Sequence, residues 1–350
     1  MLKPPPAATL LIKAARWWAG TSLAAWPGAA PAQPATAGAP TYESVRLYGT
    51  DYIDAREFAR RFGFSAIKVK PQATLQLRSR WTTIDLAVDS AEIALNGLRI
   101  FLGEPVVSCQ GGLYLSRLDA EKLLRPILGP SQGRPVLRLK TIVLDPGHGG
   151  NDPGNQNHRL KLDEKNLTLD VARRLRLLLR KRGYHVVMTR VGDRRVELED
   201  RARIAARARA DLFISIHFNA FIQSNVAGAE TYVMSPRFLR SGPQAERDAS
   251  MAATDYPANK HDHWNIVLGY QMHRQVVRNL RAPDRGLKHF RYAVLRLINC
   301  PGVLVEAAFL SNDAEARKVS TPAHRQRIAQ AIAAGVRAYD AALNRAPVGS

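Results

Sequence analysis

The chain has 350 residues, 46% of them apolar, which is enough for one large and one smaller hydrophobic core and excludes disorder throughout. Lys and Arg outnumber Asp and Glu by 51 to 30, a formal net charge of +21. A field of this size favours polyanionic partners such as nucleic acid, anionic lipid or acidic cell-wall polymer, and charge alone does not choose among them. Cys109 and Cys300 lie far apart without a Cys-x-x-Cys motif, so neither a disulfide framework nor a cysteine metal site is indicated.

Residues 1–32 have the pattern of a secretory signal peptide. Lys3, Lys13 and Arg16 precede the apolar run WWAGTSLAAWPGAA, and the small residues that follow suit cleavage by a signal peptidase. This run is too short, and too interrupted by glycine and proline, to span a bilayer as a permanent helix. We therefore expect export to the periplasm, the cell wall or the medium. A disordered cytoplasmic leader is the alternative.

Residues 33–41 consist mainly of Ala, Pro, Gly and Thr, which predicts a flexible linker. Residues 42–128 then predict a small α+β domain, with short alternating runs for strands and two short helices. Asn96-Gly97, between two of these runs, is a strong hairpin signal. The region contains no histidine and no glycine-rich phosphate loop, so we expect a structural or binding accessory domain.

Residues 129–139 are rich in proline and glycine and predict a linker to a second domain at 140–345. That domain alternates strands with longer amphipathic helices, which is typical of an α/β sheet covered by helices on both faces. The strand candidates are TIVLD, YHVVMTR, DLFISIHF, ETYVMS, YAVLRL and GVLVEAAF. One helix candidate ends at Gly183, and its apolar face carries Leu167, Val171, Leu175 and Leu178. A final helix begins at Thr321-Pro322.

Four polar side chains stand out in the second domain. His148 follows TIVLD in a glycine-rich turn, His217 closes DLFISIHF, Glu164 opens the long helix, and Glu306 lies within the otherwise apolar GVLVEAAF. The functional crevice of an α/β sheet lies at the carboxyl ends of its strands, where these residues fall. Two imidazoles and one carboxylate make a good zinc set with a position left for water, and a second carboxylate can act as a base.

Each of these residues also has a plainer structural interpretation. His148 can cap a turn, His217 can be a core histidine, and Glu164 can complement the helix dipole. Glu306 is harder to explain in that way, because a lone buried charge costs several kcal/mol unless a cation or hydrogen bonds neutralise it. No local HExxH-type motif is present, so spacing alone leaves the metal and the structural interpretations open.

Other histidines compete as ligands. His261 and His263 have a metal-like spacing, and His158 and His273 are further candidates. The segment DYPANKHDHWN, residues 255–265, is polar and predicts a loop whose histidines are solvated or line a substrate groove. We therefore rank these residues below the strand-end set.

The second domain contains, in order, IVLDPGHGGNDPG, DEKNLTLDVARRL, VVMTR, LEDRARIAARARADLFISIHFNA, GAETYVMS and VLRLINCPGVLVEAAFLSN. Over about residues 140–343 this series resembles the type 3 family of zinc-dependent N-acetylmuramoyl-L-alanine amidases. The resemblance implies that His148, Glu164 and His217 bind Zn²⁺ and that Glu306 is the catalytic glutamate. It also implies a phosphorylase/hydrolase-like fold with a mixed six-stranded sheet between helices.

The sequence departs from the family at two motifs, with SIHFNA for the usual SIHANA and VEAAFLSN for the usual VELGFLSN. Both spare the four candidate residues and can reshape the groove. Residues 252–265 also differ from the family's usual stretch. Residues 42–128 are loosely similar to a small domain named after the amino-terminal domain of copper amine oxidases, which implies neither copper nor oxidase chemistry.

Several further polar residues neighbour the candidate ligands along the chain. Asp145 and Asn219 are candidates to support a ligating histidine or to contact substrate. Arg190 and Arg201 are candidates to hold loops or to meet substrate carboxylates, and structural ion pairing is the favoured role for both.

The resemblance implies hydrolysis of the amide between N-acetylmuramic acid and the L-alanine of the stem peptide in peptidoglycan, an anionic wall polymer. The alternatives are a zinc peptidase that cuts within the stem peptide and a non-catalytic wall-binding protein. We expect a monomer, and no nucleic-acid partner, since the sequence shows no recognised nucleic-acid-binding motif. The sequence leaves open whether an activator protein is needed.

Overall fold

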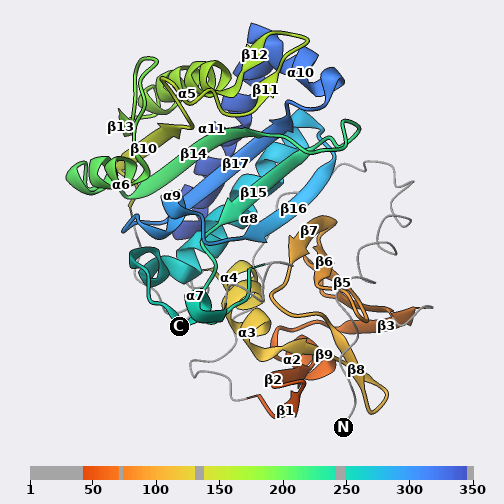
Figure 1. The fold of residues 1–350 in the computed structure, drawn as a ribbon. Coiled ribbons are helices and arrows are strands. Elements are labelled where there is room, and N and C mark those ends of the chain that lie inside the picture. The colour runs from red at the N-terminus through yellow and green to blue at the C-terminus, as the bar shows by residue number, and fades with distance from the viewer. Residues whose placement is uncertain (1–41, 71–73, 131–137, 242–248, 345–350) are drawn as a thin grey trace.

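Figure 1 shows the computed structural model of the chain, which describes residues 42–70, 74–130, 138–241 and 249–344. The predicted signal peptide and the linker predicted at 33–41 lie outside the described residues, as does most of the linker predicted at 129–139. We refer to residues 42–130 as the N-terminal part and to residues 138–344 as the C-terminal part. Among the described helices, none combines the length and the apolar character needed to cross a membrane.

The C-terminal part is built on a mixed six-stranded sheet, which confirms the predicted fold class. Its strands, in spatial order, are β13 (His185–Met188), β10 (Thr141–Pro146), β14 (Leu212–Asn219), β17 (Gly302–Phe309), β15 (Ala229–Val233) and β16 (Asp284–His289). The first four run parallel to one another, β15 runs antiparallel to β17, and β16 runs parallel to β15. The parallel strands are apolar on both sides because helices cover both faces of the sheet.

Alternating side chains of the sheet enter two separate cores. Ile142 and Leu144 of β10 pack on the face covered by α5 (Glu164–Arg180), α8 (Asp262–Leu280) and α11 (Pro322–Leu343). Val143, between them, packs on the opposite face with residues of α6 (Leu198–Arg207) and α9 (Ala293–Arg296). The period-two alternation of a strand thus fixes which face each functional side chain enters. The remaining helices are α7 (Ala249–Ala253), η5 (Pro257–His261) and α10 (Asp313–Ser320).

The N-terminal part contains two groups of strands and a short helical segment. A four-stranded antiparallel sheet is formed by β1 (Ser44–Leu47), β2 (Thr50–Asp54), β9 (Gly112–Ser116) and β8 (Val107–Cys109). A five-stranded meander follows the order β7 (Leu98–Phe101), β6 (Glu92–Leu95), β5 (Thr83–Ala87), β4 (Thr74–Arg78) and β3 (Ala66–Lys70). The helices are α2 (Ala55–Arg61), α3 (Arg117–Asp119), η3 (Ala120–Leu124) and α4 (Arg125–Leu128). Asn96 and Gly97 join β6 to β7 with φ angles of 53° and 76°, as the hairpin signal predicts.

The meander extends the sheet of the C-terminal part across the boundary between the two parts. Strand β7 pairs in parallel with β16, with Ile100 opposite Leu287, so that the strands form one eleven-stranded sheet. The backbone N–H of Arg99 also donates to the Asp284 carboxylate at 2.9 Å. The sequence predicts two separate domains, and this continuity is not visible in it. Physically, β7 covers an edge strand whose backbone groups need partners.

Two local predictions are wrong. The run YAVLRL, predicted as a strand, contains helix α9, and the sixth strand is instead the polar segment β16. A short apolar run of this kind does not distinguish a strand from a buried helical turn. The segment at 255–265, predicted as a loop, forms η5 and the first turn of α8, with Ala258 and Trp264 buried.

Candidate metal centre and active site

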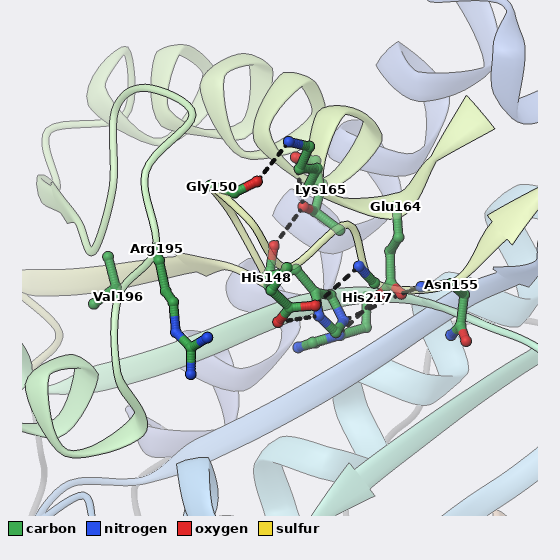
Figure 2. Close-up of polar contacts among 12 residues, drawn as sticks. His148, Gly150, Asn155, Glu164, Lys165, Arg195, Val196 and His217 are labelled. Atoms are coloured by element: carbon green, nitrogen blue, oxygen red, sulfur yellow. Dashed lines mark hydrogen bonds and ion pairs between the residues drawn. The ribbon is translucent and has the colours of Figure 1, made fainter. Parts of the chain in front are cut away.

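His148, Glu164 and His217 come together at the carboxyl edge of the sheet. One ligand atom from each lies within 4.8 Å of the others. The three residues come from the turn after β10, the first residue of α5 and the end of β14, and Figure 2 shows their side chains converging. Among the described residues, this is the single group of three or more His, Cys, Asp and Glu residues that meets this distance criterion for holding a metal ion.

The glycines after β10 make this geometry accessible. His148 itself has a φ of 61°, and Gly149, Gly150 and Gly154 have φ angles of 130°, 64° and 70°. Left-handed angles of this kind are favourable mainly for glycine. A Cβ on Gly147 would lie 2.2 Å from Cε1 of His217, so this position also has no room for a side chain. The glycine turn therefore allows the backbone to pass directly against the two imidazoles.

Glu164 contacts both histidines of the site. Its side chain is fully buried, and its carboxylate contacts Nε2 of His148 at 3.1 Å and Nδ1 of His217 at 2.9 Å. The backbone N–H groups of Asn155 and Phe218 donate to it at 2.8 and 2.9 Å. Burial raises the pKa of Glu164. The hydrogen bonds and charges of the two imidazoles lower it by a larger amount, so the resulting pKa lies well below its usual range.

Asp152 holds the ring of His148 from the other side. Its Oδ2 lies 2.9 Å from Nδ1 of His148, which leaves Nε2 of the same ring facing Glu164. Burial lowers the pKa of His148, but the hydrogen bonds and charges of Glu164 and Asp152 outweigh it, so the pKa lies above the usual value. An acidic group behind a ligating imidazole fixes its orientation and raises its basicity. Sequence reasoning missed Asp152, although it lies only four residues after His148.

These residues fit a zinc ion. Two imidazoles and a carboxylate are a frequent catalytic zinc set, and a carboxylate with a depressed pKa is available in the ionised form that a metal needs. The donor set has two nitrogens and an oxygen, without thiolates, and matches a site that keeps a position open for substrate or water.

Glu306 lies in the strand next to His217. In the pairing of β14 with β17, His217 and Glu306 are register partners, so their side chains leave the same face of the sheet. Oε2 of Glu306 is buried and has no hydrogen-bond partner among the described residues. Burial, together with the negative charges of Glu164 and Glu230, raises the pKa of Glu306 well above its usual value. The arrangement thus sets a proton-accepting carboxylate beside a candidate metal site.

Residues 142–338 match the family model described as N-acetylmuramoyl-L-alanine amidase. The chain belongs to this family. It is 34% identical over 221 residues to the N-acetylmuramoyl-L-alanine amidase AmiA of Escherichia coli, covering 57% of this chain and 76% of that protein. It is 34% identical over 204 residues to the probable cell wall amidase LytH of Staphylococcus epidermidis, covering 58% of this chain and 59% of that one.

Among solved structures, the chain is similar to an N-acetylmuramoyl-L-alanine amidase from Clostridium difficile 630. The sequence identity is 28%, and the TM-score is 0.48. The match covers 58% of this chain and 97% of the other.

In this member of the amidase family, Asp145, Arg190 and Arg201 hold the glycine turn after β10 in place. Asp145 is buried and contacts Thr189 Oγ1 at 2.7 Å, Ser215 Oγ at 2.8 Å and Arg201 at 2.6 Å. Arg201 in turn donates to the carbonyl oxygens of Pro146 and His148 at 3.1 Å. The structural role favoured for Arg201 by the sequence therefore agrees with its contacts.

Arg190 has the same kind of surroundings. Its buried guanidinium donates to the carbonyl oxygens of Pro146 and Gly147 at 3.0 and 2.7 Å, and to that of Lys165 at 2.8 Å. Burial, aided by the charge of Arg201, lowers the pKa of Arg190 to about 10, which still leaves it charged at neutral pH. These contacts favour positioning of the turn over a direct contact with substrate.

Asn219, the remaining candidate for support of a histidine, contacts Glu230 instead. Asn219 donates to Glu230 at 2.9 Å and makes no hydrogen bond to His148 or His217 within the described part of the chain. Glu230, which sequence reasoning missed, could have been found by the argument applied to Glu306, since it is also a carboxylate in an apolar strand.

The competing histidines do not gather around a second site. His273 is buried and contacts Thr231 and Asp284 at 3.0 and 2.8 Å. Nε2 of His263 contacts the Pro130 carbonyl at 2.7 Å, and His158 is exposed. Neither these histidines nor His261 belong to a cluster with metal-binding geometry in the described ranges.

Proposed function

We propose that this protein is a zinc-dependent peptidoglycan hydrolase that cleaves the amide between N-acetylmuramic acid and the L-alanine of the stem peptide. His148, Glu164 and His217 hold the zinc ion in this proposal, and Glu306 is the general base. The observation that carries it is the convergence of the first three residues at one edge of the sheet, with Glu306 in register with His217. Membership of the amidase family supports the choice of the scissile bond.

When bound, zinc supplies a Lewis acid that polarises the amide carbonyl and activates water. Glu306 accepts the proton of the attacking water on its carboxylate, whose Oε2 is buried without a partner among the described residues, and delivers it to the nitrogen of the departing L-alanine. An amine leaves poorly unless it is protonated, so one carboxylate performs both proton transfers. The raised pKa of Glu306 suits a group that must take up a proton and hold it until the amine departs.

Asp152 and the glycine turn orient the catalytic groups. The contact of Asp152 with Nδ1 of His148 fixes which ring nitrogen faces the metal site. Arg190 and Arg201 bind the carbonyl oxygens of the turn, so the turn keeps its shape while substrate passes over it. Preorganisation of this kind is required because small displacements of ligands or base are costly for the rate.

We further propose that the protein acts outside the cytoplasm on the anionic cell wall. The predicted signal peptide and the formal net charge of +21 support this location and this substrate. The names of the relatives, which include a probable cell wall amidase, point in the same direction.

Digestion of purified wall sacculi, with and without a chelator, tests the proposal. We expect release of intact stem peptides that begin with L-alanine, loss of this activity with chelator and recovery with added zinc. Fragments cut within the stem peptide would identify a zinc peptidase instead. Binding to sacculi without any released product would identify a non-catalytic wall-binding protein.

A further inference from the structure

Three neighbouring strands carry a row of functional side chains. Glu306 of β17 is the register partner of His217 in β14 on one side and of Glu230 in β15 on the other. Register partners on adjacent strands leave the same face of a sheet, about 5 Å apart. Glu306 therefore lies between a candidate metal ligand and a second carboxylate that the proposed mechanism does not use.

Glu230 is held in place as an anion. Its side chain is buried, and its carboxylate accepts from Lys288 Nζ at 2.7 Å, Arg285 Nε at 3.1 Å, Tyr232 OH at 2.7 Å and Asn219 Nδ2 at 2.9 Å. Burial raises the pKa of Glu230, but the charge and hydrogen bond of Lys288, with the other donors, lower it below its usual value. A buried carboxylate with four donors has little freedom to move.

Glu306 is held quite differently. Its buried Oε2 has no hydrogen-bond partner within the described residues, so no donor fixes this oxygen. Among the charged groups around Glu306, Glu164 and Glu230 repel its ionised carboxylate, and Lys288 attracts it. Glu230 holds Lys288 and Arg285 by its hydrogen bonds, and within the described residues neither cation forms an ion pair with Glu306. Oε2 of Glu306 therefore stays free beside its other neighbour in the row, His217.

The N-terminal part supports this arrangement from outside. Lys288 Nζ lies 5.2 Å from the ring centre of Phe101 in β7 and 5.6 Å from that of Tyr232. Strand β7 thus covers the ammonium group that contacts Glu230, at the point where it joins the sheet to β16. Cation–π contacts of this kind hold a cation in place without neutralising it.

We propose that Glu230 is a positioning residue for Glu306, and that Phe101 of the N-terminal part, through Lys288, belongs to its support. This inference rests on the proposed role of Glu306 as general base. It gives the N-terminal part a direct contribution to the active site, in addition to any binding role.

The test compares Glu230→Gln with the wild-type protein in the zinc-loaded form. The substitution keeps the size of the side chain and removes its charge. We expect kcat on sacculi or a muramyl-peptide to fall roughly 10- to 100-fold, with KM and bound zinc unchanged, because misplacement of a catalytic group affects turnover. Glu230→Asp, which restores the charge, should recover part of the loss.

Crystal structures of wild type and Glu230→Gln provide a readout that is independent of activity. We expect the Glu306 carboxylate to turn away from His217 and toward residue 230 in the variant. An unchanged Glu306 orientation, or an unchanged kcat, overturns the inference. Loss of zinc in the variant also overturns it, since Glu230 would then act through the metal site.

A matched pair of variants tests the role of the N-terminal part. Phe101→Leu removes the ring over Lys288 and should lower kcat, whereas Glu104→Gln breaks the 3.2 Å contact with Arg240 elsewhere on the same junction and should not. Equal effects of the two variants would show a general interface role and overturn this part. If Glu230→Gln does not fold, Glu230→Asp is compared with wild type by the same kinetic and structural criteria, and an unchanged kcat and Glu306 orientation overturn the inference.

Failure of the proposed function is recognised separately. In that case the wild-type protein itself releases no peptides that begin with L-alanine. The crystallographic comparison of Glu306 still tests the positioning inference under those conditions.

Discussion

Replacement of Gly154 by alanine should displace residues of the candidate metal centre. Gly154 has a φ of 70° and lies against two of the candidate ligands. A Cβ at this position would lie 2.6 Å from Cδ2 of His148, and 2.7 Å from Oε2 and 2.8 Å from Cβ of Glu164, whereas ordinary contacts begin at 3.4 Å. The added methyl group therefore cannot be accommodated unless a ligand moves.

Two costs follow from this geometry. The left-handed backbone costs a residue with a Cβ roughly 1–2 kcal/mol of stability. Relief of the closest contact requires a shift of about 0.8 Å in His148 or in the turn, which exceeds the tolerance of about 0.5 Å for a functional site. We expect the affinity for zinc to fall roughly 10- to 100-fold, as it does when a ligand loses its supporting contacts.

Gly183→Ala is the matched control. Gly183 has a φ of 88°, and a Cβ there would meet nothing within 4 Å, so the control carries the backbone cost without the clash. Urea denaturation of the zinc-free proteins should show a loss of about 1 kcal/mol or more for both variants. Competition with a chromophoric chelator should show weaker zinc binding for Gly154→Ala alone. Equal zinc affinities of the two variants would refute the assignment of these residues to the metal site.

Three further substitutions test the site and the fold. Glu306→Gln should retain zinc and lower kcat roughly 100- to 10,000-fold, measured by product release and metal content; loss of zinc along with activity would instead make Glu306 a ligand. Asp152→Asn should weaken zinc binding roughly 10- to 100-fold by removing the acidic partner of His148, and unchanged binding in chelator competition would contradict that role. Burial, with the charges of Arg327 and Lys318, lowers the pKa of His324 to about 4, below its value of about 6.5 in an unfolded chain. Its contribution to stability is therefore complete above that higher value and is lost progressively as the pH falls toward 4. Urea denaturation at pH 7 and pH 5 should show a smaller decline for His324→Gln than for wild type, and equal declines would be incompatible with a buried neutral imidazole.

The sequence predicts the centre of the fold well because its signals there are local. Runs such as TIVLD and GVLVEAAF are apolar on both faces, which is typical of buried parallel strands, and their ends mark the functional edge. Each of the four candidate residues has a local signal in the sequence: a strand end for His148 and His217, a helix start for Glu164 and a charge within an apolar strand for Glu306. The family resemblance, and not the spacing, predicts that they meet around one metal ion, because ligands far apart along the chain form no local sequence motif.

Strand β16 and its pairing with β7 are not predictable from local signals of this kind. Strand β16 reads DRGLKH, without the alternation of a half-buried strand, because its polar residues have specific partners. Asp284 contacts His273 and Arg99, while Arg285 and Lys288 contact Glu230. A strand whose side chains serve a polar network loses the hydrophobic pattern by which strands are recognised. The pairing with β7 is equally invisible, because it joins residues far apart in sequence.

Glu164 and Glu306 show how the fold assigns different chemistry to identical side chains. Both are withdrawn from water, yet Glu164 has two imidazoles and two backbone N–H groups around it, whereas Oε2 of Glu306 has no partner among the described residues. The same burial therefore ends in opposite pKa shifts, downward for Glu164 and upward for Glu306. A carboxylate that stays ionised suits a cation, and one that readily takes a proton suits acid–base work. The difference arises from the register of β17 beside β14 and from the position of α5, which place donors around one carboxylate and leave the other facing a second acid.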